Sequence, residues 1–289
     1  MIKVTPSPLT THAFNPNRIP LPCRQHDLVE WISADGSNCF ETIAAARKED
    51  RRRARRLLRS TDPNARALGR WLETATAARL LPLSPVSSFY MRTCRRKLLG
   101  AVMAHIYGEG LCDTEVKAFT LIHPAWFYKA GTLHEIDPKA IRKHLRRCFD
   151  RVGITAAEGA LWAALHGEFD GNGYQLHFHG VAAGAKATLI CKLYSRNGFD
   201  RTADIQQPIN CKDVYDLSGW LSYCMKSYWP QRLKYIDKHG KPRRGRKQGL
   251  QRPQLEEFLM WMSKQHLLSL IIHSGFSSTA WGHVGNGKL

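Results

Sequence analysis

The sequence predicts an α+β protein: an antiparallel sheet of about five strands with flanking helices, preceded by an α-helical basic N-terminal region. Segments before residue 110 are rich in Ala, Leu and Arg, which favour helix. After residue 114, β-branched and aromatic residues become frequent, which favours strands. Asp170-Gly171-Asn172-Gly173 joins two strand-like runs and is typical of a tight hairpin, which indicates antiparallel pairing.

The first 110 residues are expected to form an arm followed by helices. Five prolines and little periodicity predict a flexible, Pro-rich arm over residues 1–40. The basic helical region 41–110 follows, and the proline-rich break at 81–85 indicates a boundary inside it. Its helices are predicted at 41–59, 63–81 and 86–107.

The segment 111–235 is expected to form the domain that contains the sheet. The run 116–123 is predicted to be a strand because it is rich in β-branched and aromatic residues. Asp137-Pro138 has the form of an N-cap followed by proline at the first helical position. Gly153 supplies a stop, so a helix is predicted over 138–152.

The C-terminal part is expected to continue this pattern. Further elements are predicted at 160–169 (strand), 174–182 (strand), 214–229 (helix) and 254–273 (helix). Gly and Pro argue against a regular element in the basic loop 241–252. Residues 236–289, which comprise this loop and the last helix, are expected to pack on the domain 111–235.

Composition excludes several classes of protein. The chain has 289 residues, of which 43% are hydrophobic, enough for a packed core. The absence of an 18-residue apolar run or a secretory signal predicts a cytoplasmic protein with no membrane partner. Eight cysteines without a C-x-x-C pair are expected to be reduced thiols.

The charge is strongly positive and unevenly distributed. Lys and Arg number 43 against 24 acidic residues, a net charge of +19 that favours a polyanionic partner. Basic residues cluster at 47–59 and 241–252, either as ordinary solvated faces or as phosphate contacts. The expected DNA-binding residues are Arg51, Arg52, Arg53, Arg55, Arg243, Arg244, Arg246 and Lys247.

The run GYQLHFHG predicts a candidate metal site. In a strand, His177 and His179 project from one face about 7 Å apart. If the hairpin closes over Gly171-Asn172, Glu168 lies on the same face of the neighbouring strand. Two imidazoles and a carboxylate suit a divalent ion, although His166, opposite His177, is a rival third ligand.

The downstream helix adds a candidate nucleophile. Tyr223 and Lys226 lie one turn apart, off the apolar stripe to which Tyr228 belongs. An ammonium beside a phenol stabilises the phenolate, which can attack phosphorus. The alternative is that Tyr223 is simply a half-buried tyrosine at the edge of the core.

Three short motifs together resemble the HUH endonucleases of the rolling-circle replication initiator (Rep) type. They are Phe119-Thr120-Leu121, His177-Phe178-His179 and Tyr223-Cys224-Met225-Lys226, in that order. The resemblance covers about residues 115–230 and implies an HUH/RRM-like palm. It also implies Mg²⁺ or Mn²⁺ held by Glu168, His177 and His179, and a single catalytic tyrosine, Tyr223.

The resemblance implies metal-dependent nicking and joining of single-stranded DNA through a 5′-phosphotyrosine. Such an enzyme initiates rolling-circle replication of a plasmid, phage or mobile element on single-stranded or hairpin origin DNA, with a host helicase or polymerase as a further partner. The alternatives are a relaxase or transposase of the same chemistry, or a non-catalytic DNA-binding regulator. A histidine-triad hydrolase is disfavoured because position 181 is Val.

Overall fold

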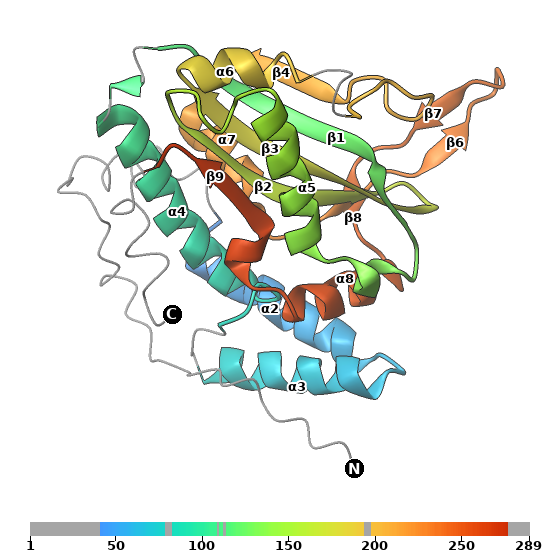
Figure 1. The fold of residues 1–289 in the computed structure, drawn as a ribbon. Coiled ribbons are helices and arrows are strands. Elements are labelled where there is room, and N and C mark those ends of the chain that lie inside the picture. Colours follow the sequence, from blue (N-terminus) through green and yellow to red (C-terminus); the bar gives the residue numbers. More distant parts are fainter. Residues whose placement is uncertain (1–40, 79–82, 109, 112–113, 194–197, 277–289) are drawn as a thin grey trace.

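The structure, a computed structural model, describes residues 41–276 except 79–82, 109, 112–113 and 194–197. The predicted arm 1–40 and the end of the predicted helix 63–81 lie outside the described residues. In the part that is described, no helix is long and apolar enough to cross a membrane. The protein is α+β, as predicted (Figure 1).

A mixed seven-stranded sheet forms the centre of the molecule. Its strands follow the order β4-β1-β3-β2-β5-β8, and β9 pairs with β2 as well. Their bounds are β1 Val116–Lys129, β2 Leu161–Phe169, β3 Gly173–Ala183, β4 Ile209–Asp213, β5 Pro230–Gln231, β8 Gln248–Gly249 and β9 Ile271–Ser274. The prediction of a purely antiparallel sheet of about five strands is wrong in detail, because β5 runs parallel to β2 and the short strands β5, β8 and β9 extend the edge.

The helices divide between the two faces of the sheet. The bounds are α2 Ile43–Leu58, α3 Pro63–Ala77, α4 Ser88–Gly108, α5 Pro138–Arg151, α6 Ala185–Ile190, α7 Leu217–Cys224 and α8 Gln254–Ser263. One core cluster joins α5, α6 and α8 to Leu161, Ala163 and Leu165 of β2. A second cluster joins α4 and α7 to Trp162 and Ala164 on the opposite face.

The hairpin β2–β3 closes as its sequence predicts. Asp170 caps the turn by accepting from the amides of Asn172 and Gly173, and Gly171 takes a φ of 109°, which glycine tolerates. The strands then pair Glu168 with Gln175 and His166 with His177. The predicted register is therefore confirmed, and β2 and β3 place these side chains on the face covered by α4 and α7.

Two predicted helices end early. The helix predicted over 214–229 stops at Cys224, because the carbonyls of Cys224 and Ser227 accept from the side chains of His166 and Arg53 instead of from helical amides. The helix predicted over 254–273 stops at Ser263, and Ile271–Ser274 pairs with the edge of β2 instead. Both corrections reflect contacts between residues far apart in sequence.

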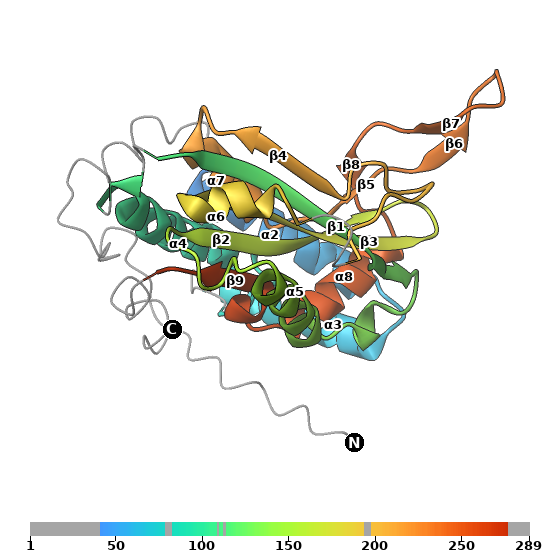
Figure 2. The ribbon, with the colours of Figure 1, turned by 45° about the horizontal axis from the view of Figure 1, so that its top comes forward.

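The basic loop 241–252 contains regular structure, contrary to the prediction. Its strand β7 (Pro242–Arg244) pairs antiparallel with β6 (Lys234–Ile236), and β8 continues into the main sheet. The β6–β7 hairpin projects from one end of the sheet in both views (Figures 1 and 2). The basic residues of this segment are therefore held on a β-ribbon.

A buried polar network joins α2 to α4 and to the segment after α7. Asp50 accepts from the amides of Ser88 and Phe89 and from the Ser87 hydroxyl, which satisfies donors at the start of α4. The Arg53 guanidinium donates to the carbonyls of Val86 and Ser227 at 2.8 and 2.7 Å. The helices α2 and α4 thus contact the segment that carries Lys226.

We expect Arg53→Met to lower the free energy of unfolding by about 3 kcal/mol, because it leaves buried carbonyls without their charged donor. Urea denaturation followed by circular dichroism measures the change. Arg51→Met, an exposed position on the same helix, is the matched control and should change stability by less than about 0.5 kcal/mol. Equal effects for both variants would contradict the assigned role of the Arg53 network.

Candidate functional site

A chain of hydrogen bonds fixes the two histidines of β3. Their Nε2 atoms lie 3.0 Å apart. His177 Nδ1 donates to the Gln175 carbonyl at 3.2 Å, since a carbonyl can only accept. Its Nε2 is then the acceptor for His179 Nε2–H, and His179 Nδ1 accepts from the Thr120 hydroxyl at 2.8 Å. Thr120 reaches His179 because β1 pairs these two residues directly.

Both imidazoles are neutral at physiological pH. Burial lowers the pKa of His177 to about 4, with the charges of Lys226 and Lys247 contributing. Burial also lowers the pKa of His179 well below its usual value, and the neighbouring histidines act in the same direction. Neutral imidazole is the form that binds metal, so neither ring has to lose a net proton, although the His179 proton has to move from Nε2 to Nδ1 before Nε2 can act as a ligand.

His166 lies beside this pair and is more deeply buried. Its ring centre is 5.4 Å from that of His179 and 6.1 Å from that of His177. Its Nε2 donates to the Cys224 carbonyl, 2.5 Å away, and Nδ1 is buried without a hydrogen-bond partner among the described residues. Burial holds its pKa well below the usual range. His166 therefore anchors the end of α7 to β2.

Tyr223 and Lys226 reach the histidines from the end of α7. The Tyr223 ring lies 5.0 Å from the His179 ring and stacks on Trp220, whose indole N–H donates to the Gly180 carbonyl. The Lys226 ammonium lies 4.1 Å from the centre of the Tyr223 ring. Lys226 lies after the end of α7, but its amide donates a hydrogen bond to the Tyr223 carbonyl, and the resulting turn keeps the two residues together.

The Lys226 side chain is partly desolvated. Burial lowers the pKa of its ammonium, and the Tyr223 hydroxyl acts in the opposite direction. Tyr228 is exposed and does not belong to the apolar core, contrary to the prediction; its ring lies 5.5 Å from the Lys226 ammonium. The ammonium is therefore close to two tyrosine rings.

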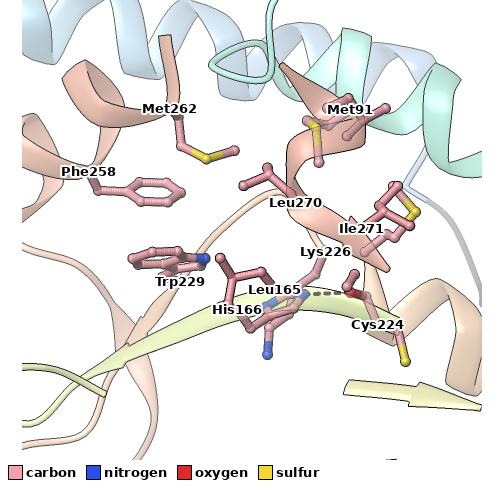
Figure 3. Close-up of a pocket in the computed structure, with 13 residues that line it drawn as sticks. Met91, Leu165, His166, Cys224, Lys226, Trp229, Phe258, Met262, Leu270 and Ile271 are labelled. Atoms are coloured by element: carbon pink, nitrogen blue, oxygen red, sulfur yellow. Dashed lines mark hydrogen bonds between the residues drawn. The ribbon is translucent and has the colours of Figure 1, made fainter. Parts of the chain in front are cut away.

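A small apolar cavity lies behind this arrangement. Figure 3 shows Trp229, Phe258, Met262 and Leu270 around it, together with Lys226 and His166. Its volume of about 20 Å³ is room for about one water. The cavity is too small for a substrate, whereas Tyr223 and Lys226 are partly exposed to solvent.

Glu168 lies on the predicted face but contacts cations. Its carboxylate is 3.9 Å from both Arg232 and Arg244 and 3.7 Å from Lys247. Among the described residues, no three His, Cys, Asp or Glu side chains gather closely enough to hold a metal. The two Nε2 atoms do fit adjacent positions around an octahedral ion, because nitrogens about 2.1 Å from the ion and at a right angle to each other lie about 3 Å apart.

The predicted DNA-binding residues fall on two surfaces. Arg51, Arg52 and Arg55 are exposed on α2, and Arg51 and Arg55 line a shallow groove between α2 and α3. The prediction that Arg53 binds DNA is wrong, because its guanidinium is buried and donates to backbone carbonyls. The second group is exposed on or beside the β6–β7 hairpin and consists of Arg243, Arg244, Arg246 and Lys247.

Three residues of the site were missed from the sequence. Thr120 lies within the first motif, but its role depends on the pairing of β1 with β3. Trp220 stacks on Tyr223, a contact that the helical periodicity alone does not reveal. Arg232 contacts Glu168 from the end of β5, a strand that has no signal in the sequence.

We expect Thr120→Val to weaken Mn²⁺ binding about tenfold or more. Valine keeps the shape but removes the hydroxyl that orients His179 in either tautomer, and losses of this kind are typical of residues that position metal ligands. Isothermal titration with Mn²⁺ alone measures the affinity. Thr188→Val, which removes an exposed hydroxyl on α6, is the control and should leave it unchanged.

We compared the chain with protein-family models, curated proteins and solved structures. No family model, curated protein or solved structure matches it. We therefore argue function from the contacts of His177, His179, Tyr223 and Lys226.

Proposed function

We propose that the protein is a metal-dependent endonuclease that nicks and rejoins single-stranded DNA through Tyr223, in the manner of HUH rolling-circle initiators. One observation carries the proposal: Tyr223 lies 5.0 Å from His179, with the Lys226 ammonium 4.1 Å from its ring. These residues come from motifs about 45 positions apart in the chain. Their juxtaposition supports a phenol nucleophile beside a metal-binding pair.

The reaction requires Tyr223 to release its phenolic proton to water and act as a phenolate. Its oxygen attacks a backbone phosphorus, forms the 5′-phosphotyrosine and displaces the 3′-oxygen, which takes up a proton to become a hydroxyl. The Lys226 ammonium stabilises the negative charge on the phenolate and then on the phosphorane. The stacked Trp220 restricts the ring of Tyr223. Attack by a 3′-hydroxyl on the phosphotyrosine reverses the step and joins the strand without ATP.

The chain offers ligands for the divalent ion that this chemistry needs. His177 and His179 would hold Mg²⁺ or Mn²⁺ through Nε2, with Glu168 as the third ligand and His166 its alternative. When bound, the ion would polarise the scissile phosphate. The Thr120 hydroxyl can accept from His179 Nδ1 when Nε2 binds the ion, so the ring keeps its orientation.

The positive surface supplies the remaining requirement, a DNA strand held over the site. Arg243, Arg244 and Lys247 extend from the edge of the candidate site along the β6–β7 hairpin. Phosphates bound there release counterions, which favours association at low salt. We propose an origin of replication on a plasmid, phage or mobile element as the DNA substrate, and a host helicase or polymerase as a further partner.

We expect Tyr223→Phe to abolish the covalent protein–DNA adduct, because phenylalanine keeps the ring but lacks the attacking oxygen. A denaturing gel of protein incubated with 5′- and 3′-labelled single-stranded DNA pools and Mn²⁺ measures the adduct, and EDTA should remove it. Tyr228→Phe, the nearby exposed tyrosine, is the control and should retain it. A Mn²⁺-dependent adduct in Tyr223→Phe contradicts the nucleophile assignment. No adduct with the unaltered protein favours a non-catalytic DNA-binding regulator.

We expect Lys226→Met to slow adduct formation about 100-fold at saturating DNA, because the transition state loses its nearest ammonium. A single-turnover time course separates this effect from DNA binding. Lys212→Met, at an exposed position of β4, is the control of equal charge change and should retain the rate. Equal rates for both variants would contradict a catalytic role for Lys226.

A further inference from the structure

Three cations surround the carboxylate of Glu168. Arg232, Arg244 and Lys247 come from the end of β5, from β7 and from the residue before β8. All three lie 3.7 to 3.9 Å from the Glu168 oxygens. One carboxylate is thus shared by three cations, which leaves an excess of positive charge at the edge of the candidate site.

These ion pairs are loose and exchangeable. The side chains of Arg232, Arg244 and Lys247 are 32%, 50% and 43% exposed, and ion pairs of this kind hold their partners weakly. By contrast, Lys234, in the same cationic ribbon of residues 232–247, binds Asp170 and Asp204 at 2.8 and 2.7 Å. The backbone pairing of β6 with β7 holds the ribbon together with the shorter Lys234 contacts, so the cations around Glu168 can move without unfolding it.

The positive charge of Lys247 also acts on the histidines. Burial is the main cause that lowers the pKa of His177 and of His179, and the charge of Lys247 lowers both further. Glu168, on the same sheet face as these histidines, is opposite Gln175 and two positions from His166. The carboxylate therefore lies between a metal-binding pair on one side and a cationic ribbon on the other.

We propose that Glu168 exchanges Arg232, Arg244 and Lys247 for the divalent ion, and that the released cations then bind DNA phosphates. This inference rests on the proposed function, because it takes the ion and the DNA strand as ligands of the site. A carboxylate oxygen that ligates the ion has less negative charge to offer the ribbon. The ribbon from 232 to 247 carries eight basic residues and one acid, so phosphate is the ligand that its freed groups fit.

The exchange couples two binding events. The ion strengthens DNA binding by freeing cations, and DNA strengthens ion binding by removing the competitors of Glu168. Linkage requires the two factors to be equal, and couplings of this kind are typically about 5- to 150-fold. Without the second ligand, Glu168 and its three cations remain paired, so each ligand alone has to compete with these ion pairs and binds more weakly.

The first test measures DNA affinity in the Tyr223→Phe protein, which binds without reacting. Fluorescence anisotropy with a labelled oligothymidylate is recorded in Mn²⁺ and in EDTA at constant ionic strength. We expect Mn²⁺ to increase the DNA affinity of the Tyr223→Phe protein about tenfold. When Glu168→Gln is introduced as a second substitution, the DNA affinity in EDTA should already be at this higher level, and Mn²⁺ should increase it little further. The control is Asp204→Asn, which removes an equal charge from the contacts of the same ribbon but leaves Glu168 in place.

The second test measures Mn²⁺ affinity of the DNA-free protein from the paramagnetic resonance signal of free Mn²⁺. Lys247→Gln should bind Mn²⁺ a few-fold more tightly and DNA more weakly, because one competitor of Glu168 is removed. Arg246→Gln is the control of equal charge change; among the described residues it forms no ion pair with Glu168. It should weaken DNA binding while leaving Mn²⁺ affinity unchanged.

Several outcomes overturn the exchange. The first is that Glu168→Gln tightens DNA binding no more than Asp204→Asn does. The second is that Mn²⁺ still strengthens DNA binding to the full extent in Glu168→Gln. The third is that the Mn²⁺ affinity is unchanged in Lys247→Gln, or is raised equally in Arg246→Gln. The adduct assay with the unaltered chain is run in parallel. Adduct formation without coupling rejects the exchange and keeps the nuclease, whereas coupling without an adduct rejects the nuclease and keeps the exchange.

Discussion

The register of the β2–β3 hairpin is the constraint on which the candidate site depends. The Asp170 cap and the positive φ of Gly171 fix the turn, and the turn fixes which residues of the two strands face each other. A slip of one residue would turn His177 and His179 toward α5 and α8 and bring Phe178 beneath α7. The geometry of the candidate site is therefore set by a four-residue turn that contains none of its residues.

Burial of the histidines depends on that register. With α4 and α7 packed over this face, water is excluded from the imidazoles and they remain neutral, while the Thr120 hydroxyl and the Gln175 carbonyl fix their orientation. Helix α7 also brings Tyr223 to the edge of this buried region, where its side chain is partly exposed. Helix α7 therefore covers the imidazole nitrogens and leaves a phenol partly exposed beside them.

Local signals predicted the elements that are locally determined. Asp137-Pro138 and Gly153 gave the limits of α5, and the Asp170–Gly173 run gave the hairpin, because caps and turns act over a few residues. The end of α7 depends on Arg53, 174 positions from Ser227. Strand β9 exists because β2 has a free edge, and the partners of Glu168 come from a ribbon whose strands have two or three residues. Such long-range contacts leave no periodicity that a single sequence could reveal.

The bond from Arg53 to Ser227 limits how this protein can be divided. The carbonyl that receives the guanidinium lies one residue after Lys226, and the same guanidinium also binds Val86 at the approach to α4. A fragment that begins at the sheet would lose the donor and leave the Ser227 carbonyl, which the core now encloses, without its partner. The basic helices are thus not an interchangeable module: in a chimera, a foreign helical segment would have to bring its own arginine to the same point.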